Sequence, residues 1–144
     1  MEITEVNEYT YEVLEALNAL LPQLSSSAQP ITETDLKEII ASTAVHLLLA
    51  HENSEYFGTL TLVVFPIITG KRAWIEDVVV SENARGKGVG KLLTEKAINL
   101  AAVHGVKTVD LTSRPSREAA NKLYKSAGFQ QRETNVYRYS SEVY

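Results

Sequence analysis

The amino-acid sequence predicts a mixed α/β (α+β) fold, and two observations carry that prediction. Segments rich in β-branched and large apolar residues, which are typical of strands, occur among segments whose apolar residues recur at helical spacing. In the middle of the chain a strand, a helix and a second strand are expected in succession, which favours a parallel crossover. The 144 residues, 44% of them hydrophobic, suit one domain spanning residues 1–144.

The first half of the chain is expected to pair a hairpin with two helices. Apolar residues fall at helical spacing until Pro22, where the first helix is expected to stop. Thr32 or Thr34 can cap the second helix. Two apolar, β-branched segments separated by a polar cluster predict an antiparallel hairpin. The elements expected here are strands over Ile3–Val6, Val45–His51 and Phe57–Phe65, and helices over Tyr9–Leu21 and Asp35–Ser42.

The second half is expected to alternate strands and helices and to close with a pair of strands. Gly105 and Gly128 stand where glycine caps at helix C-termini belong. A turn at Thr134-Asn135 separates the last two strands. The expected elements are strands over Ala73–Val80, Thr108–Thr112, Gln130–Glu133 and Val136–Tyr139, and helices over Val89–His104 and Arg117–Ala127.

The bulk composition excludes several classes of protein. A formal net charge of −4 argues against a protein that coats nucleic acid. The chain has no cysteine, which excludes disulfides and a cysteine nucleophile. Met1–Glu5 has no apolar signal core, and no segment approaches the ~18 apolar residues of a membrane span. We therefore expect a cytoplasmic protein with neither a nucleic-acid nor a membrane partner.

Arg85–Gly90 carries three glycines between an expected strand and an expected helix. Glycines let main-chain N–H groups approach a phosphate, and a helix N-terminus adds unpaired donors and positive potential. The segment is one residue short of a Walker A loop, and Leu92 stands where a magnesium-binding hydroxyl belongs. Its G-x-G-x-G spacing also departs from the G-x-G-x-x-G of dinucleotide-binding folds. The segment therefore predicts an anion-binding site that is neither a Walker A loop nor a dinucleotide-binding loop.

Arg85-x-x-Gly88-x-Gly90 resembles the [RQ]-x-x-G-x-[GA] motif of the GCN5-related N-acetyltransferase (GNAT) superfamily. Ile75–Val80 is similar to that family's fourth strand, and Asn121–Phe129 is similar to its motif N-x-x-[LF]-Y-x-x-x-G-F. The resemblance covers most of the chain. It implies a mixed, mostly antiparallel central sheet of about six to seven strands flanked by about four helices, in agreement with the element order above.

The resemblance implies acetyl-CoA as acetyl donor and no metal. Main-chain N–H groups of Gly86–Lys91 would hold the pyrophosphate, with Arg85, Lys87 and Lys91 supplying positive charge. The backbone of Val78–Val80 would pair with the pantetheine, where the family's strand splays from its neighbour at a bulge. The implied cofactor-binding residues are Val78, Val79, Val80, Arg85, Gly86, Lys87, Gly88, Val89, Gly90, Lys91, Asn121 and Tyr124.

Tyr124 is the predicted general acid, because family members use a tyrosine here to protonate the leaving thiolate, and a phenol held close to it can do so. A core tyrosine is the alternative. Glu76 is the preferred general base, and its neighbour Asp77 is expected to point to the opposite face of the strand. In histone-type members the carboxylate lies two positions earlier, where this chain has Trp74. The base therefore stays open between Glu76, Asp77 and a water chain.

The leading function is transfer of an acetyl group to a primary amine by direct attack in a ternary complex. The acceptor is a small-molecule or peptide amine, and a homodimer is possible. The alternative is an acyl-CoA-binding sensor module of the same fold without catalysis. His46, His51 and His104 do not have metal-ligand spacing and are interpreted as structural.

Overall fold

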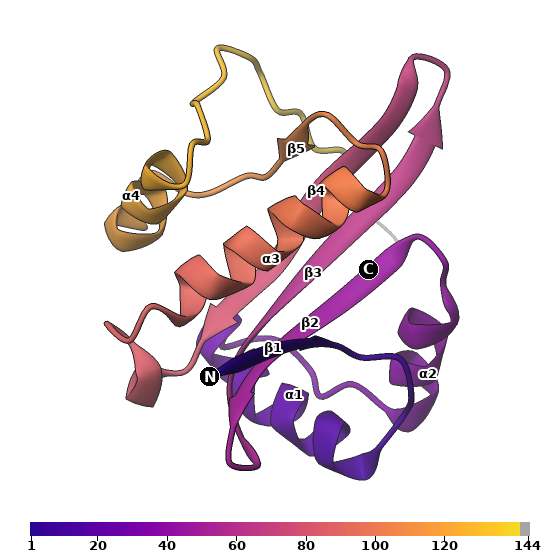
Figure 1. Ribbon diagram of the computed structural model, residues 1–144, viewed down its shortest axis with the longest axis vertical. Coiled ribbons are helices and arrows are strands. Elements are labelled where there is room, and N and C mark those ends of the chain that lie inside the picture. The colour runs from indigo at the N-terminus through magenta and orange to yellow at the C-terminus, as the bar shows by residue number, and fades with distance from the viewer. Residues whose placement is uncertain (142–144) are drawn as a thin grey trace.

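The computed structural model describes residues 1–141, and a five-stranded sheet forms the centre of that part of the chain (Figure 1). The strands lie in the order β1-β2-β3-β4-β5, antiparallel except for the parallel pair β4–β5. They are β1 (Glu2–Glu5), β2 (Val45–Glu52), β3 (Glu55–Ile67), β4 (Gly70–Val80) and β5 (Val109–Asp110). The predicted mixed, mostly antiparallel sheet is confirmed, with fewer strands among the described residues than the six to seven expected.

The sheet lies between two layers of helices (Figure 1). Leu48 and Ala50 of β2 pack with α3 residues such as Leu93, whereas Leu47 and Leu49 pack with α1 and α2 on the other face. This period-two alternation along one strand is what a sheet covered on both faces requires. The helices are α1 (Tyr11–Leu24), α2 (Glu33–Ala41), α3 (Val89–Val103) and α4 (Glu118–Ser126), with a short 3₁₀ turn, η1 (Glu82–Ala84). None of the described helices is long and apolar enough to cross a membrane.

Local capping explains where α2 begins and why α1 ends later than predicted. Thr32 accepts a hydrogen bond from the Asp35 N–H, and the Asp35 carboxylate accepts one from the Thr32 N–H. This reciprocal pair defines the N-terminus. The prediction that Pro22 stops α1 is wrong, because the helix continues to Leu24. Proline removes its own N–H and crowds the carbonyl four residues earlier, but the N–H groups after it stay available, and the Ser25 N–H donates to the Leu21 carbonyl at 3.1 Å.

The two closing strands expected over residues 130–133 and 136–139 are absent from the described part of the chain, where residues 129–141 carry no helix or strand. Val136, Tyr137 and Tyr139 are 73%, 87% and 92% exposed. A strand needs a partner and a face to bury, and these side chains pack on almost nothing. Their alternating sequence pattern is therefore insufficient to form a strand in the isolated chain.

Gly58 lies where β3 passes beneath α3 and opposite the end of β4. A Cβ on Gly58 would stand 2.8 Å from the Val79 carbonyl oxygen and 3.1 Å from Val89 Cγ1. Backbone cannot move aside as a side chain can. The strand pair and the helix therefore approach this closely only because residue 58 is a glycine.

We expect Gly58→Ala to lower the free energy of unfolding by about 1–3 kcal/mol, the usual cost of overpacking a buried site. Urea titration of the wild type and the variant measures the difference. Unchanged stability would contradict this close approach of β3 to β4 and α3.

Candidate active site

The end of β4 is open along one edge because β5 leaves it early. The two strands pair only at Ala73 with Val109 and at Trp74 with Asp110. Beyond Trp74 no described strand pairs with β4 on the side away from β3. Backbone donors and acceptors in the last part of β4 therefore face a gap between the diverging strands. A ligand with amide groups could add to that edge as an extra strand does.

The bulge expected in β4 is present. Thr59 pairs with Val79 and Thr61 with Glu76, so Asp77 and Val78 together stand opposite Leu60. Asp77 takes a φ of 50°, a left-handed conformation uncommon for residues other than glycine. After the bulge, Val79 and Val80 pair again with Thr59 and Gly58 of β3, so the bulge shifts the register of the last part of β4 without ending the ladder. The Val79 side chain packs inward and is only 5% exposed, so a ligand bound there would contact the backbone of Val79 and not its side chain.

The glycine segment forms the loop that joins β4 to α3. Gly86 and Gly88 have φ values of 81° and 77°, and Gly88 is the N-cap of α3. The first intrahelical bond runs from the Leu92 N–H to the Gly88 carbonyl. No hydrogen bond from the N–H groups of Gly88–Lys91 is found within the described residues. A helix N-terminus with unpaired donors and exposed glycines before it can hold an anion.

Three exposed cations lie in this loop or in the first turn of α3. Arg85 and Lys87 form no ion pair within residues 1–141. Lys91 lies 3.9 Å from Glu95 one turn along α3, a weak surface pair. The loop thus combines unpaired N–H donors with unpaired positive charge, which is the donor set a pyrophosphate needs.

Gly90 connects this loop to α4. A Cβ on Gly90 would stand 3.0 Å from Leu123 Cδ2 and 3.6 Å from Val80 Cγ2. The missing side chain lets α4 lie against the first turn of α3 and the end of β4. Tyr124 follows Leu123, so the two motifs that lie apart in the sequence meet at one end of the β4 edge.

Tyr124 is the one residue of α4 that is buried, with 6% of its surface exposed. Its ring meets the Phe129 ring edge-on, with centroids 5.8 Å apart. Burial raises the pKa of the Tyr124 hydroxyl above its ordinary value of 10.0, an effect that the Arg117 guanidinium partly opposes. No described group hydrogen-bonds the hydroxyl. The phenol is therefore held protonated and free to donate.

Asn121 supports the turn that leads into α4. Its Nδ2 donates to the carbonyls of Arg114 and Arg117, at 2.9 Å each. These bonds use the amide nitrogen and leave the side-chain oxygen without a described partner. The expected contact between Asn121 and the cofactor stays a prediction.

The two candidate bases are both exposed. The Trp74 indole N–H donates to Glu76 Oε1 at 2.7 Å, since residues two apart on a strand share a face. This bond orients the Glu76 carboxylate and leaves its second oxygen open. Trp74 and Glu76 stand two apart in an expected strand, so their spacing was enough to predict this hydrogen bond, but we did not predict it. Asp77 lies at the bulge, where side chains no longer alternate regularly between the two faces of the strand, so the expectation that Asp77 points opposite to Glu76 does not apply.

The histidines form structural contacts. His46 Nδ1 lies 3.1 Å from Glu5 Oε2, and the His46 and His104 rings lie 4.6 Å apart. His51 contacts the Tyr56 ring. No group of metal-binding side chains occurs within residues 1–141. The His46–His104 contact joins β2 to the end of α3, a pairing that local spacing could not predict.

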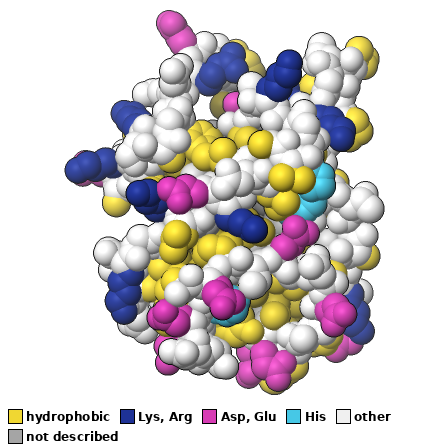
Figure 2. Space-filling model, viewed as in Figure 1, with side chains coloured by type: hydrophobic (Ala, Val, Ile, Leu, Met, Phe, Trp, Pro, Cys, Tyr) yellow, Lys and Arg dark blue, Asp and Glu magenta, His cyan; other side chains and the backbone are white. Residues whose placement is uncertain are grey.

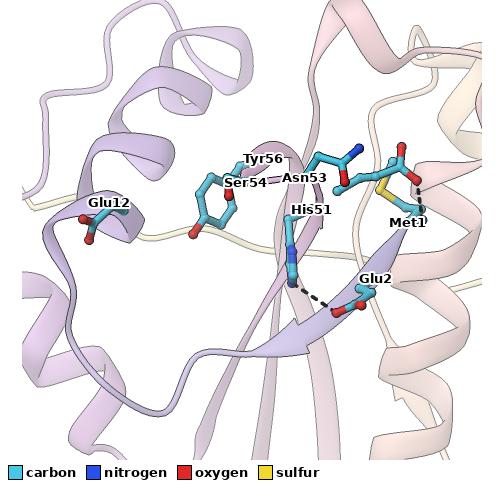
Figure 3. A pocket seen from close by; sticks show the side chains of 8 residues that line it. Met1, Glu2, Glu12, His51, Asn53, Ser54 and Tyr56 are labelled. Carbon is cyan, nitrogen blue, oxygen red and sulfur yellow. Dashed lines mark hydrogen bonds and ion pairs between the residues drawn. The ribbon is translucent and has the colours of Figure 1, made fainter.

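A hollow of about 680 Å³ lies beside β1 and the β2–β3 turn (Figure 3). The Met1 amino group donates to Glu52 Oε1 at 2.8 Å and holds the pKa of that carboxyl below its usual range. His51 and Glu2 approach each other at 4.0 Å across the same hollow. None of the predicted site residues lines it.

Comparisons with known proteins identify the family to which this fold belongs. The model of the Acetyltransferase (GNAT) family matches residues 11–129. The chain is 31% identical over 101 residues to an uncharacterised N-acetyltransferase, YhfO, of Bacillus subtilis (strain 168), covering 69% of this chain and 68% of that one. The protein belongs to the GNAT family of acetyltransferases.

Solved structures share the same fold. One is a protein of Agrobacterium tumefaciens str. C58 that is provisionally named an acetyltransferase. It superimposes on this chain with a TM-score of 0.87 at 25% identity, covering 97% of this chain and all of that one. AAC(6')-Iy, solved with the bisubstrate analogue CoA-S-monomethyl-acetylneamine, has a TM-score of 0.81 at 17% identity, covering 97% of each chain. The second likeness concerns the fold alone.

Proposed function

We propose that the protein is an acetyl-CoA-dependent N-acetyltransferase that acetylates a primary amine by direct attack in a ternary complex. One observation carries the proposal. The open edge of β4 is bordered at one end by the glycine loop and by the helix of Tyr124, which meet at the Gly90–Leu123 contact. Family membership supports the acetyl-transfer chemistry.

The residues present suit acetyl-CoA. The unpaired N–H groups of Gly88–Lys91, with Arg85 and Lys87 beside them, would hold the pyrophosphate. The free backbone edge of Val78–Val80 would hold the pantetheine amides. When bound, acetyl-CoA supplies a thioester carbonyl open to attack and a thiolate leaving group.

Two side chains would handle the protons. Glu76 would accept a proton from the acceptor amine, directly or through water, and so free its lone pair for attack on the carbonyl carbon. A C–N bond forms and the C–S bond breaks. The acylated nitrogen would lose its remaining extra proton to water as the amide forms, Tyr124 would give its proton to the departing sulfur, and water would return a proton to Tyr124.

The acceptor is proposed to be a primary amine on a small molecule or a peptide. The AAC(6')-Iy complex, in which one analogue joins CoA to an acetylneamine, supports an aminosugar as one class to try. A thiol-release assay with acetyl-CoA against aminosugars, polyamines, amino acids and lysine peptides tests the proposal. Intersecting initial-rate plots are expected. Parallel plots together with a trapped acetyl-enzyme would overturn direct transfer.

We expect Glu76→Gln to lower kcat by about 100-fold, the low end of what general base catalysis contributes. Glutamine keeps the shape and can still accept the Trp74 N–H bond. Asp77→Asn is the matched control, because it removes one negative charge from the adjacent residue, and it should keep most of the rate. A larger loss in Asp77→Asn than in Glu76→Gln would transfer the base to Asp77.

A second candidate is an acyl-CoA-binding sensor module without catalysis. The exposure of both Glu76 and Asp77 favours it, because a catalytic carboxylate is usually tuned by burial. Tight binding of acetyl-CoA with no acetylation across the whole amine panel would establish it.

A further inference from the structure

A second hollow lies at the end of β4 opposite to the glycine loop. Its volume is about 440 Å³, and it opens between the β3–β4 turn and the segment that follows α3. Lys71, Arg72 and Lys107 line it, together with the hydroxyl residues Thr69 and Thr108. Two glycines, Gly70 and Gly105, complete the lining.

All charged residues of this hollow are cations. None of the three forms an ion pair within residues 1–141, and no acidic residue lines the hollow. Lys71 Nζ donates to the His104 carbonyl at 3.2 Å, so the α3 C-terminus, the negative end of the helix dipole, holds this side chain in place. Three cationic residues thus line one hollow of a chain whose net charge is −4.

Charges of one sign repel where they converge on one hollow, and a bound anion would remove that cost. Surface charges that serve only solubility are usually interspersed with the opposite sign. On the face shown in Figure 2, Lys and Arg dominate the half that carries α3, α4 and the hairpin end, while Asp and Glu gather over α1 and α2. The hollow belongs to the positive half.

The hollow is separate from the predicted pyrophosphate loop. Arg72 and Val80 stand eight residues apart on β4, which corresponds to about 26 Å at about 3.3 Å per residue. A single diphosphate on the glycine loop therefore cannot occupy both places.

We propose that this hollow binds a small oxyanion carrying two or more negative charges. Lys71, Arg72 and Lys107 would neutralise it, and the hydroxyls of Thr69 and Thr108 would donate hydrogen bonds. The ligand is a phosphorylated metabolite or a polycarboxylate, since both present clustered anionic oxygens. The proposal holds whichever amine the protein acetylates, and it does not require catalysis.

Glycine amide resonances distinguish the two anion sites by NMR. Gly70 and Gly105 report on the hollow, and Gly86 and Gly88 report on the loop. Inorganic pyrophosphate and citrate are titrated separately into ¹⁵N-labelled protein at constant ionic strength. Saturable shifts at Gly70 and Gly105 with pyrophosphate alone identify a phosphate site, with citrate alone a polycarboxylate site, and with both a general oxyanion site. No saturable shift with either anion overturns the proposal.

Variants test whether the cations carry the binding. The double variant Lys71→Ala/Lys107→Ala should weaken the response of Gly70 and Gly105 at least about tenfold, as expected for losing charge-assisted bonds, and leave that of Gly86 and Gly88 unchanged. Lys96→Ala/Lys125→Ala is the matched control, because it removes the same charge from exposed sites elsewhere. An equal loss in the control would show a bulk charge effect and overturn the proposal. Arg72→Gln/Lys107→Gln keeps the Lys71–His104 bond and replaces the first variant if that variant unfolds.

Discussion

Tyr124→Phe is expected to lower kcat by about 100- to 1,000-fold while acetyl-CoA affinity stays within about threefold of the wild type. Proton donation to a leaving group contributes rate in this range. The substitution removes only the hydroxyl, so the buried ring and its edge-on contact with Phe129 remain. Because no described group hydrogen-bonds the hydroxyl, its removal leaves no polar atom unsatisfied. Stopped-flow or steady-state thiol release measures kcat, and calorimetry measures affinity.

The pH dependence provides a second readout of the same residue. Burial raises the pKa of the Tyr124 hydroxyl above 10.0. A raised pKa means that the proton is retained to higher pH, so the acid form is present throughout the range below pH 10. The wild type should therefore show no decline in kcat from this group between neutral pH and pH 10.

Tyr11→Phe is the matched control for Tyr124→Phe. Tyr11 is 62% exposed at the start of α1, and the same loss of one phenolic oxygen there should leave kcat unchanged. A fully active Tyr124→Phe variant would remove Tyr124 from the chemistry and leave it as a core residue, the alternative that its burial also allows.

The elements that were predicted correctly are those whose signals are local. The helix expected over Val89–His104 and the cap of α2 depend on neighbours within a few positions, and the structure has both. The helix expected over Arg117–Ala127, with its glycine cap at Gly128, is present as α4 (Glu118–Ser126). The prediction of a strand around Tyr137 is wrong. Apolar and polar residues do alternate there, but within the described residues no neighbouring strand pairs with this segment and no surface buries its apolar side chains. Secondary structure that depends on a distant partner cannot be predicted from spacing alone.

The candidate site also has parts that the sequence predicts and parts that only the three-dimensional structure reveals. The glycine loop and Tyr124 were found from motifs, because each motif is a short segment with fixed spacing. Their meeting at Gly90 and Leu123 required the three-dimensional fold. The basic hollow brings Arg72 of β4 together with Lys107 of the segment between α3 and β5, and no local pattern connects them.

Gly88→Val is expected to weaken acetyl-CoA binding by about 10- to 100-fold. At a φ of 77° a residue with a Cβ is strained by about 1–2 kcal/mol, and the strain falls where α3 presents its first unpaired N–H groups. A β-branched side chain would also stand beside the donors that the pyrophosphate needs. Titration calorimetry with CoA measures the loss, and urea unfolding measures the accompanying fall in stability.

Gly105→Val separates strain from ligand binding. Gly105 has the same φ of 77°, and a Cβ there, as at Gly88, meets nothing within 4 Å. It follows the C-terminus of α3, whereas Gly88 caps the N-terminus. Both variants should lose similar stability, but only Gly88→Val should lose CoA affinity, because only the N-terminal end carries unpaired donors and positive dipole potential. Equal losses of affinity would mean that strain in α3 as a whole, and not the donors of its first turn, governs cofactor binding.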